Sequence, residues 1–220
     1  MPDSDQLSFM DRLSLLVDRE LTERANRRLQ YRLQQACRED LDYQHPRGLD
    51  KTLIQHLLGE RWLVEHLNCL ITGPTGVGKT WIACALAQHA CRLGYTYTAR
   101  YVRLPRLLPE LALAHADGRY PKLLREYAKA QVLVIDDWGL APLTSEGRRD
   151  VLEILDDRHH RQSILVTSQL PVANWHAYLD DPTLADTLLD RLVHNAYTLN
   201  LTGESLRKRK TPLTNAITEQ

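Results

Sequence analysis

The sequence lacks long apolar runs and paired cysteines. No stretch approaches the roughly 18 apolar residues of a membrane-spanning helix, so we do not expect an integral membrane protein. None of the four cysteines forms a CxxC pair, so we expect no zinc site and a reducing compartment. The first residues, Met1–Asp5, are acidic and carry no apolar secretory segment, so we expect a soluble, cytoplasmic protein.

The chain also has no net charge of either sign. The 28 basic and 28 acidic residues cancel, so the chain as a whole is not a polycation, and any nucleic-acid binding must come from local clusters. The 220 residues are 43% apolar, which is enough for the core of one α/β domain with a small appendage. No internal repeat or low-complexity segment is evident.

The strongest motif in the sequence is GPTGVGKT at residues 73–80. It follows a short apolar run, 69–72, and precedes a helix-like segment, 81–93, which is the strand–loop–helix order of a P-loop. Glycines let backbone N–H groups face a phosphate chain, and the positive end of the helix adds to their attraction. Lys79 is then expected to contact the β- and γ-phosphates and Thr80 to bind Mg²⁺. The candidate nucleotide-binding residues are Gly73, Pro74, Thr75, Gly76, Val77, Gly78, Lys79 and Thr80.

A second motif consists of four aliphatic residues, 132–135, followed by Asp136 and Asp137. Such a run predicts a strand buried on both faces, with two carboxylates at its end, as in a Walker B motif. We expect Asp136 to hold Mg²⁺ directly or through water and Asp137 to polarise the attacking water. The alternative is a solvated acidic turn.

Apolar periodicity and chain breakers divide the chain into a helical N-terminal segment (1–45), an ATPase core (46–204) and a basic motif with a flexible tail (205–220). The residues between His45 and Asp50 are expected to form the linker between the first two parts. A break at Gly59 is anticipated within the helical stretch 51–67. The expected helices cover 6–41, 51–67, 81–93, 104–116, 121–130, 144–160 and 184–192, and the expected strands cover 69–72, 95–102, 132–137, 163–167 and 196–201.

Gln169 lies just beyond the strand expected over 163–167. A polar amide at that point would lie beside the Walker B strand end, where it could hydrogen-bond the γ-phosphate or a water. A plain turn is the alternative. His159 and His160 suit the negative end of the preceding helix, and the sequence offers them no metal partner.

Two clusters of basic residues are candidates for DNA contact. The region from Arg19 to Arg38 holds six arginines against two glutamates, and a second run begins at Arg207. A solvated helix face is the alternative for the first cluster. The candidate DNA contacts are Arg24, Arg27, Arg28, Arg32, Lys208, Arg209 and Lys210.

From about Leu13 to Arg209 the chain resembles IstB, the ATP-dependent helper protein of a group of bacterial insertion sequences. IstB belongs to the AAA+ class and is similar to the DnaC and DnaI helicase loaders. The resemblance is carried by GPTGVGKT (73–80), LPRLL (104–108), DDWGLAPL (136–143), VLEILDDR (151–158), VTSQLP (166–171), DPTLAD (181–186) and DRLVHNAY (190–197).

The resemblance implies an AAA+ type P-loop fold, a three-layer sandwich with a central parallel sheet. It also implies ATP and Mg²⁺ as cofactors, ATP hydrolysis, assembly into a ring or spiral on duplex DNA, and recruitment of a transposase. By position, Gln169 matches sensor 1, Arg191 the arginine finger that reaches a neighbouring subunit's γ-phosphate, and Arg207 sensor 2. From the residues alone, Arg191 could instead be a surface residue beside Asp190, and Arg207 a DNA contact.

The chain departs from the family pattern at two points. Many AAA+ proteins carry Glu where this chain has Asp137, and the shorter arm withdraws the carboxylate by about one C–C bond, ~1.5 Å. We therefore expect slow hydrolysis. The family usually has a longer leader before Leu13, so we also expect a truncated N-terminal domain.

Three other functions remain open from the sequence. A helicase loader would share every ATP-site residue. A P-loop phosphotransferase would need an arginine-rich lid, which is not evident between the two Walker motifs. A DNA-binding protein with a purely structural nucleotide would not need Asp137.

Overall fold

The computed structural model describes residues 48–93 and 98–206. The expected helix over 6–41, the candidate DNA contacts in both basic clusters, and Arg207 lie outside these residues. The proposed division into 1–45, 46–204 and 205–220 therefore stays a prediction.

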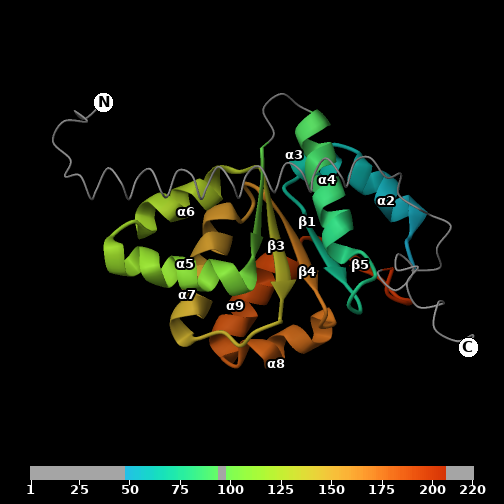
Figure 1. Cartoon of the computed structure of the whole chain (residues 1–220). Coiled ribbons are helices and arrows are strands. Elements are labelled where there is room, and N and C mark those ends of the chain that lie inside the picture. The colour runs from blue at the N-terminus through green and yellow to red at the C-terminus, as the bar shows by residue number, and fades with distance from the viewer. Residues whose placement is uncertain (1–47, 94–97, 207–220) are drawn as a thin grey trace, which may run out of the picture. The chain divides into compact units, whose positions relative to one another are not determined.

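Five parallel strands form the central sheet, in the order β2-β3-β4-β1-β5 (Figure 1). Because all pairings are parallel, the carboxyl ends of the strands meet along one edge of the sheet, here named the carboxyl edge, and their amino ends meet along the opposite amino edge. In α/β sheets of this kind, ligands bind beyond the carboxyl ends. The strands are β1 (Asn68–Thr72), β2 (Ala99–Arg103), β3 (Val132–Trp138), β4 (Ser163–Ser168) and β5 (Ala196–Asn200).

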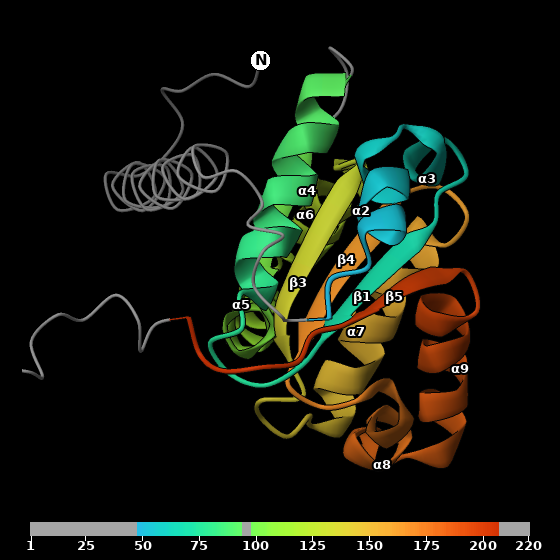
Figure 2. The ribbon, with the colours of Figure 1, turned by 90° about the vertical axis from the view of Figure 1, so that its right-hand side faces the viewer.

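Helices cover both faces of the sheet and form the two outer layers (Figures 1 and 2). One apolar cluster packs helices α2 to α4 against one face, and a second cluster packs α5 to α9 against the other. The helices are α2 (Lys51–Leu58), α3 (Arg61–Val64), α4 (Lys79–Leu93), α5 (Leu104–Asp117), α6 (Tyr120–Lys129), α7 (Ser145–Arg158), α8 (Trp175–Leu179) and α9 (Pro182–Val193), with a short 3₁₀ turn, η2 (Val172–Asn174).

Strand β3 shows how the sequence builds these layers. Val132 and Val134 belong to the cluster under α2 to α4, while Leu133 and Ile135 belong to the cluster under α5 to α9. Because side chains alternate between the faces of a strand, a strand buried on both faces must be apolar at every position. The predicted three-layer α/β sandwich with a parallel sheet is confirmed.

Helix ends follow local capping signals. The Asp50 side chain accepts the Thr52 N–H at 2.8 Å and starts α2, which ends at Gly59, where the sequence indicated a break. Thr144 accepts the Gly147 N–H at 3.0 Å and starts α7, as predicted. Helix α9 begins two residues earlier than predicted, because Asp181 caps it and Pro182 takes its first position.

Arg158, the last residue of α7, is fully buried. Its guanidinium donates hydrogen bonds to the carbonyl oxygens of Tyr127 at 2.6 Å, Ala130 at 2.7 Å and Ser163 at 2.7 Å. Burial lowers the pKa of this arginine to about 9. The arginine that closes VLEILDDR therefore ties α6, α7 and β4 together.

Within the described part of the chain, no helix combines the length and the apolar character that crossing a bilayer requires.

Candidate nucleotide-binding site

The loop between β1 and α4 requires glycine at positions where the chain takes positive φ. Gly73, Gly76 and Gly78 have φ of 143°, 86° and 98°. A Cβ on Gly73 would lie 2.3 Å from the Leu201 carbonyl oxygen, so any side chain there would clash. Helix α4 starts at Lys79, and its positive end therefore faces the loop. This curved backbone suits a phosphate chain.

Lys79 is held inside the loop. Its side chain is buried, and its Nζ donates hydrogen bonds to the carbonyl oxygens of Gly73 and Pro74, both at 2.7 Å. The ammonium charge therefore lies within the curve of the loop, where the phosphate-bearing part of a nucleotide would need it.

Thr80 and Asp136, the two predicted magnesium ligands, are in direct contact. The Thr80 hydroxyl donates to Asp136 Oδ1 at 2.8 Å, and the Tyr101 hydroxyl donates to Oδ2 at 2.6 Å. The Thr167 hydroxyl is a third donor to this buried carboxylate. A carboxylate beside a hydroxyl is an all-oxygen donor set of the kind that Mg²⁺ takes together with phosphate oxygens. The residues present therefore fit a magnesium nucleotide.

Asp137 lies in a different setting from Asp136. The pairing of β3 with β4 shifts register between Ile135 and Trp138, and Asp137 has a φ of 61°. Its carboxylate forms an ion pair with Arg103, with Oδ2 2.6 Å from Nε and 2.5 Å from Nη2. The hydrogen bond that Arg103 donates to Asp137 raises the pKa of Arg103. The irregularity thus directs the second carboxylate toward β2, whereas a bare strand end would leave it in solvent.

Sequence reasoning missed three residues that contact these carboxylates. Arg103 and Tyr101 come from β2, and Thr167 from β4. The sequence held a signal for each of them. Tyr101 and Arg103 alternate with the apolar Val102, which places both polar side chains on one face of the strand. Thr167 is a polar residue that follows the aliphatic run 164–166. The Thr167 hydroxyl also accepts the Asp137 backbone N–H at 3.3 Å, so it links the Asp136 carboxylate to the backbone of Asp137.

Gln169 is exposed, one residue beyond the end of β4. Its position in the chain puts it at the carboxyl edge, because β4 lies between β3 and β1. Within β4, the polar side chain that contacts Asp136 is that of Thr167. The sensor role of Gln169 stays a prediction.

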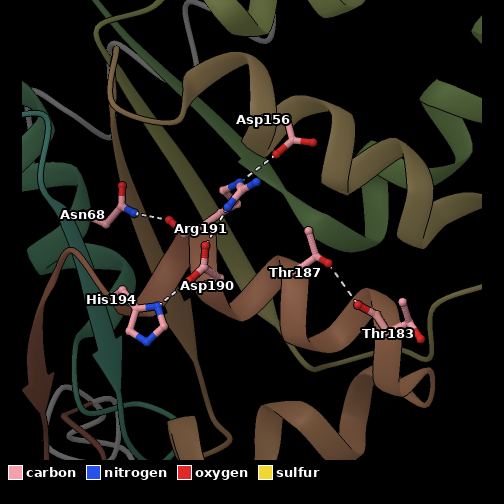
Figure 3. A network of polar contacts seen from close by, with 7 residues as sticks. All are labelled: Asn68, Asp156, Thr183, Thr187, Asp190, Arg191 and His194. Carbon is pink, nitrogen blue, oxygen red and sulfur yellow. Dashed lines mark hydrogen bonds and ion pairs between the residues drawn. The ribbon is translucent and has the colours of Figure 1, made fainter.

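Arg191 lies at the amino edge of the sheet (Figure 3). The side chain of Asn68, the first residue of β1, donates to the Arg191 carbonyl oxygen at 2.9 Å. The phosphate-binding loop follows the other end of β1. Because β1 has five residues, its two ends are about 16 Å apart. Arg191 and the loop of the same subunit are therefore far apart.

The Arg191 guanidinium is paired with two carboxylates. Its Nε lies 2.9 Å from Asp156 Oδ1, and its Nη1 lies 2.6 Å from Asp190 Oδ2, as Figure 3 shows. Their hydrogen bonds and negative charges raise the pKa of Arg191, with Asp156 contributing most. The side chain stays 30% exposed, so it remains accessible to a second molecule.

Histidines surround the same region. Arg191 lines a shallow hollow together with His66, His159 and His160. Burial lowers the pKa of His159, and the nearby charges of His160 and Arg191 lower it further. Within the described residues, no group of three or more His, Cys, Asp or Glu side chains could hold a metal ion.

Arg207 lies outside the described residues, but the residue before it is described. The Leu206 N–H donates to the Gly76 carbonyl oxygen at 3.0 Å, so the chain reaches the phosphate-binding loop immediately before Arg207.

Comparisons with known proteins identify the family of the chain. A family model described as IstB-like ATP binding protein matches residues 1–214. The insertion sequence ATP-binding protein y4pL of Sinorhizobium fredii is 49% identical over 214 residues, covering 94% of this chain and 86% of that protein. The IS21 ATP-binding protein of Pseudomonas aeruginosa is 31% identical over 211 residues, covering 93% and 79%.

Solved structures extend the likeness in fold. The structure of DnaI has a TM-score of 0.60 and 22% identity, with 70% of this chain and 87% of that one covered. The DnaC helicase loader has a TM-score of 0.58 and 21% identity, with 76% and 98% covered. At these identities the likeness concerns the fold alone.

Proposed function

The chain belongs to the family of IstB-like ATP binding proteins, and from that premise we propose that it is a Mg²⁺-dependent ATPase that assists DNA transposition. The observation that carries the proposal is the 2.8 Å contact between Thr80 and Asp136 beside a loop that encloses the Lys79 ammonium. A glycine loop, a buried lysine and a hydroxyl–carboxylate pair together form a site for a magnesium triphosphate.

Each residue then has a defined task. The loop N–H groups and Lys79 bind the phosphates, and Thr80 with Asp136 holds Mg²⁺, which supplies charge neutralisation at the phosphate oxygens. Asp137 orients the attacking water. Because Arg103 occupies its Oδ2, Oδ1 is the oxygen left to accept that hydrogen bond. This ion pair and the short Asp arm both support slow turnover in an isolated subunit.

Arg191 is proposed to act on the nucleotide of a neighbouring subunit. The distance between the two edges of the sheet supports action in trans, because one guanidinium cannot span it within a subunit. ATP binding would then favour a ring or spiral in which each carboxyl edge meets the amino edge of the next copy. The pairs with Asp156 and Asp190 must loosen or rearrange at that moment.

Duplex DNA and a transposase are the proposed partners. Assembly of this protein on DNA, followed by its release, would recruit the transposase to the DNA. The names of the relatives, which place them in insertion sequences, support this proposal. The proposed DNA contacts are Arg24, Arg27, Arg28, Arg32, Lys208, Arg209 and Lys210. Neutralising Arg27, Arg28 and Arg32 should weaken DNA binding and flatten its salt dependence.

Sizing the protein on duplex DNA tests the proposal directly. With a non-hydrolysable ATP analogue and Mg²⁺ we expect a large complex, and without nucleotide a small one. The Lys79→Ala variant is the matched control and should stay small under both conditions. Equal sizes with and without the analogue would contradict ATP-driven assembly. Co-purification separates a transposition helper, which should retain a transposase, from a loader, which should retain a helicase.

A further inference from the structure

The residues after β5, Leu201–Leu206, cross the phosphate-binding loop and are named the strap. The Leu201 N–H donates to the Thr72 carbonyl oxygen at 2.8 Å, and the Leu206 N–H donates to the Gly76 carbonyl oxygen at 3.0 Å. In Figure 2 this red segment leaves β5 and runs past the ends of the neighbouring strands. Two backbone hydrogen bonds therefore fasten the strap to the start and the middle of the loop.

The strap approaches the loop so closely that only glycine fits at positions 73 and 76. A Cβ on Gly76 would lie 2.0 Å from Ser205 Oγ and 2.7 Å from Ser205 Cβ. At the other end, a Cβ on Gly73 would lie 2.3 Å from the Leu201 carbonyl oxygen. Such separations leave no room for a methyl group, so these glycines serve the strap as well as the positive φ of the loop.

The hydrogen bond at Gly76 has a directional consequence. In a trans peptide the C=O and the following N–H point in opposite directions. Since the Gly76 carbonyl faces the Leu206 N–H, the Val77 N–H of the same peptide faces away from the strap. The side chain of Val77 is buried in the core, which anchors the far end of that peptide.

We propose that the strap is a positioning element of the nucleotide site: the Leu206 N–H, with Ser205 seated on Gly76, fixes the Gly76–Val77 peptide so that its N–H faces the phosphates. This inference rests on the proposed ATP site and adds residues from the far end of the chain to it. Without the strap the Gly76 carbonyl loses its hydrogen-bond donor, and a peptide rotated toward the site would turn this carbonyl to a phosphate and repel it.

Leu206→Pro tests the strap because proline removes the N–H donor. We expect it to weaken binding of a fluorescent ATP analogue about tenfold, the effect of losing roughly 1.4 kcal/mol of charge-assisted hydrogen bonding. The matched control is Leu206→Ala, which keeps the N–H and should bind within about twofold of the native chain. Inorganic tripolyphosphate as a competitor should lose affinity by a similar factor, because the strap acts on the phosphate cradle.

Ser205 provides a second, independent pair of variants. Ser205→Val places a branched side chain against Gly76 and should weaken ATP binding severalfold, whereas Ser205→Ala fits the same space and should not. If Leu206→Pro does not fold, the Ser205 variants test the positioning role of the strap instead. Thermal unfolding without nucleotide verifies that each variant compared is folded.

Steady-state kinetics distinguish positioning from general damage. A lost phosphate contact should raise KM and leave kcat nearly unchanged, whereas partial unfolding would lower kcat. The positioning role of the strap is refuted if Leu206→Pro binds ATP as tightly as the native chain. If Leu206→Pro does not fold, tight ATP binding by Ser205→Val refutes the role instead. If the native chain itself binds no ATP, or if Lys79→Ala binds equally well, it is the proposed function that fails.

Discussion

The two edges of the sheet differ in how complete they are. At the carboxyl edge, three hydroxyls from β2, β4 and α4 converge on Asp136 of β3 and satisfy this buried carboxylate. At the amino edge, Arg191 is partly exposed and pairs with Asp156 and Asp190, whose side chains are about half-exposed. The residues of the first edge fit a ligand within one subunit, whereas the second edge is proposed to act in turnover only when it meets another molecule.

This contrast reflects the physical demands of each task. Holding Mg²⁺ and a triphosphate requires oxygen ligands in a rigid, desolvated place. A guanidinium that acts on a neighbour must stay at the surface, with partners weak enough to exchange, and exposed ion pairs contribute little to stability. Substitutions at each edge should therefore affect binding and turnover separately.

Lys79→Ala should remove the carboxyl-edge site alone. We expect ATP affinity to fall about a hundredfold or more, because a buried ammonium that faces phosphates is lost. Isothermal titration with ATP and Mg²⁺ measures this. Arg191→Ala is the control and should bind ATP normally. Retained affinity in Lys79→Ala would remove the basis of the site.

Arg191→Ala should remove the amino-edge function alone. Turnover in the DNA-bound assembly should fall about a thousandfold, the usual effect of losing an arginine finger. A mixture of Lys79→Ala and Arg191→Ala subunits should recover part of the activity, because each supplies the edge that the other lacks. Normal turnover in Arg191→Ala would rule out the finger role, and no recovery in the mixture would argue against action in trans.

Asp137→Asn should lower turnover about a hundredfold while leaving ATP affinity unchanged, because the proposed role of this residue is to act on the attacking water. Arg103→Gln should have the opposite sign and raise basal turnover a few-fold, since it frees the Asp137 carboxylate. Phosphate release assays measure both. If Asp137→Asn hydrolyses ATP normally, the nucleotide serves a structural purpose.

Arg158→Met and Arg191→Ala compare how much two arginines near the amino edge contribute to the free energy of unfolding. We expect a loss of about 3 kcal/mol in the free energy of unfolding, because several buried carbonyls lose their donor. Arg191→Ala should cost less than about 1 kcal/mol, as exposed pairs do. Urea unfolding measures both. A similar cost for the two would mean that Arg191 is structural.

Two histidines should give the smallest effects, with opposite signs. The hydrogen bond between His115 and the accepting Asp150 carboxylate raises the pKa of His115, so its contribution to stability is present below about pH 6.5 and is lost as the pH rises through the raised value. Burial lowers the pKa of His159, so its contribution to stability is present above about pH 6.5 and is lost as the pH falls through the lowered value.

Unfolding of His115→Gln and His159→Gln between pH 5 and 8 tests these signs. The first variant should be destabilised mainly at low pH. The second should lose less stability than the native chain on acidification. Parallel pH profiles for the two variants would contradict the assignment.

Much of the fold was predictable from the sequence because its signals are local. The aliphatic run before Asp136 indicated a strand buried on both faces, and Thr144 marked the start of α7. The phosphate-binding loop was also readable, since its N–H groups come from one contiguous stretch, 73–80. Helix α8 was missed because five residues carry too little periodicity to be recognised.

The sequence by itself determined that the chain has a glycine loop with a lysine, a strand ending in two carboxylates, and the family to which they belong. Only the tertiary structure decided which partner each carboxylate has, that the strap crosses Gly76, and that Arg191 lies at the opposite edge from the loop. The reason is distance along the chain: Asp137 meets Arg103 across 34 positions, and Leu206 meets Gly76 from the far end of the domain. Strand order sets these meetings, and no local pattern encodes it.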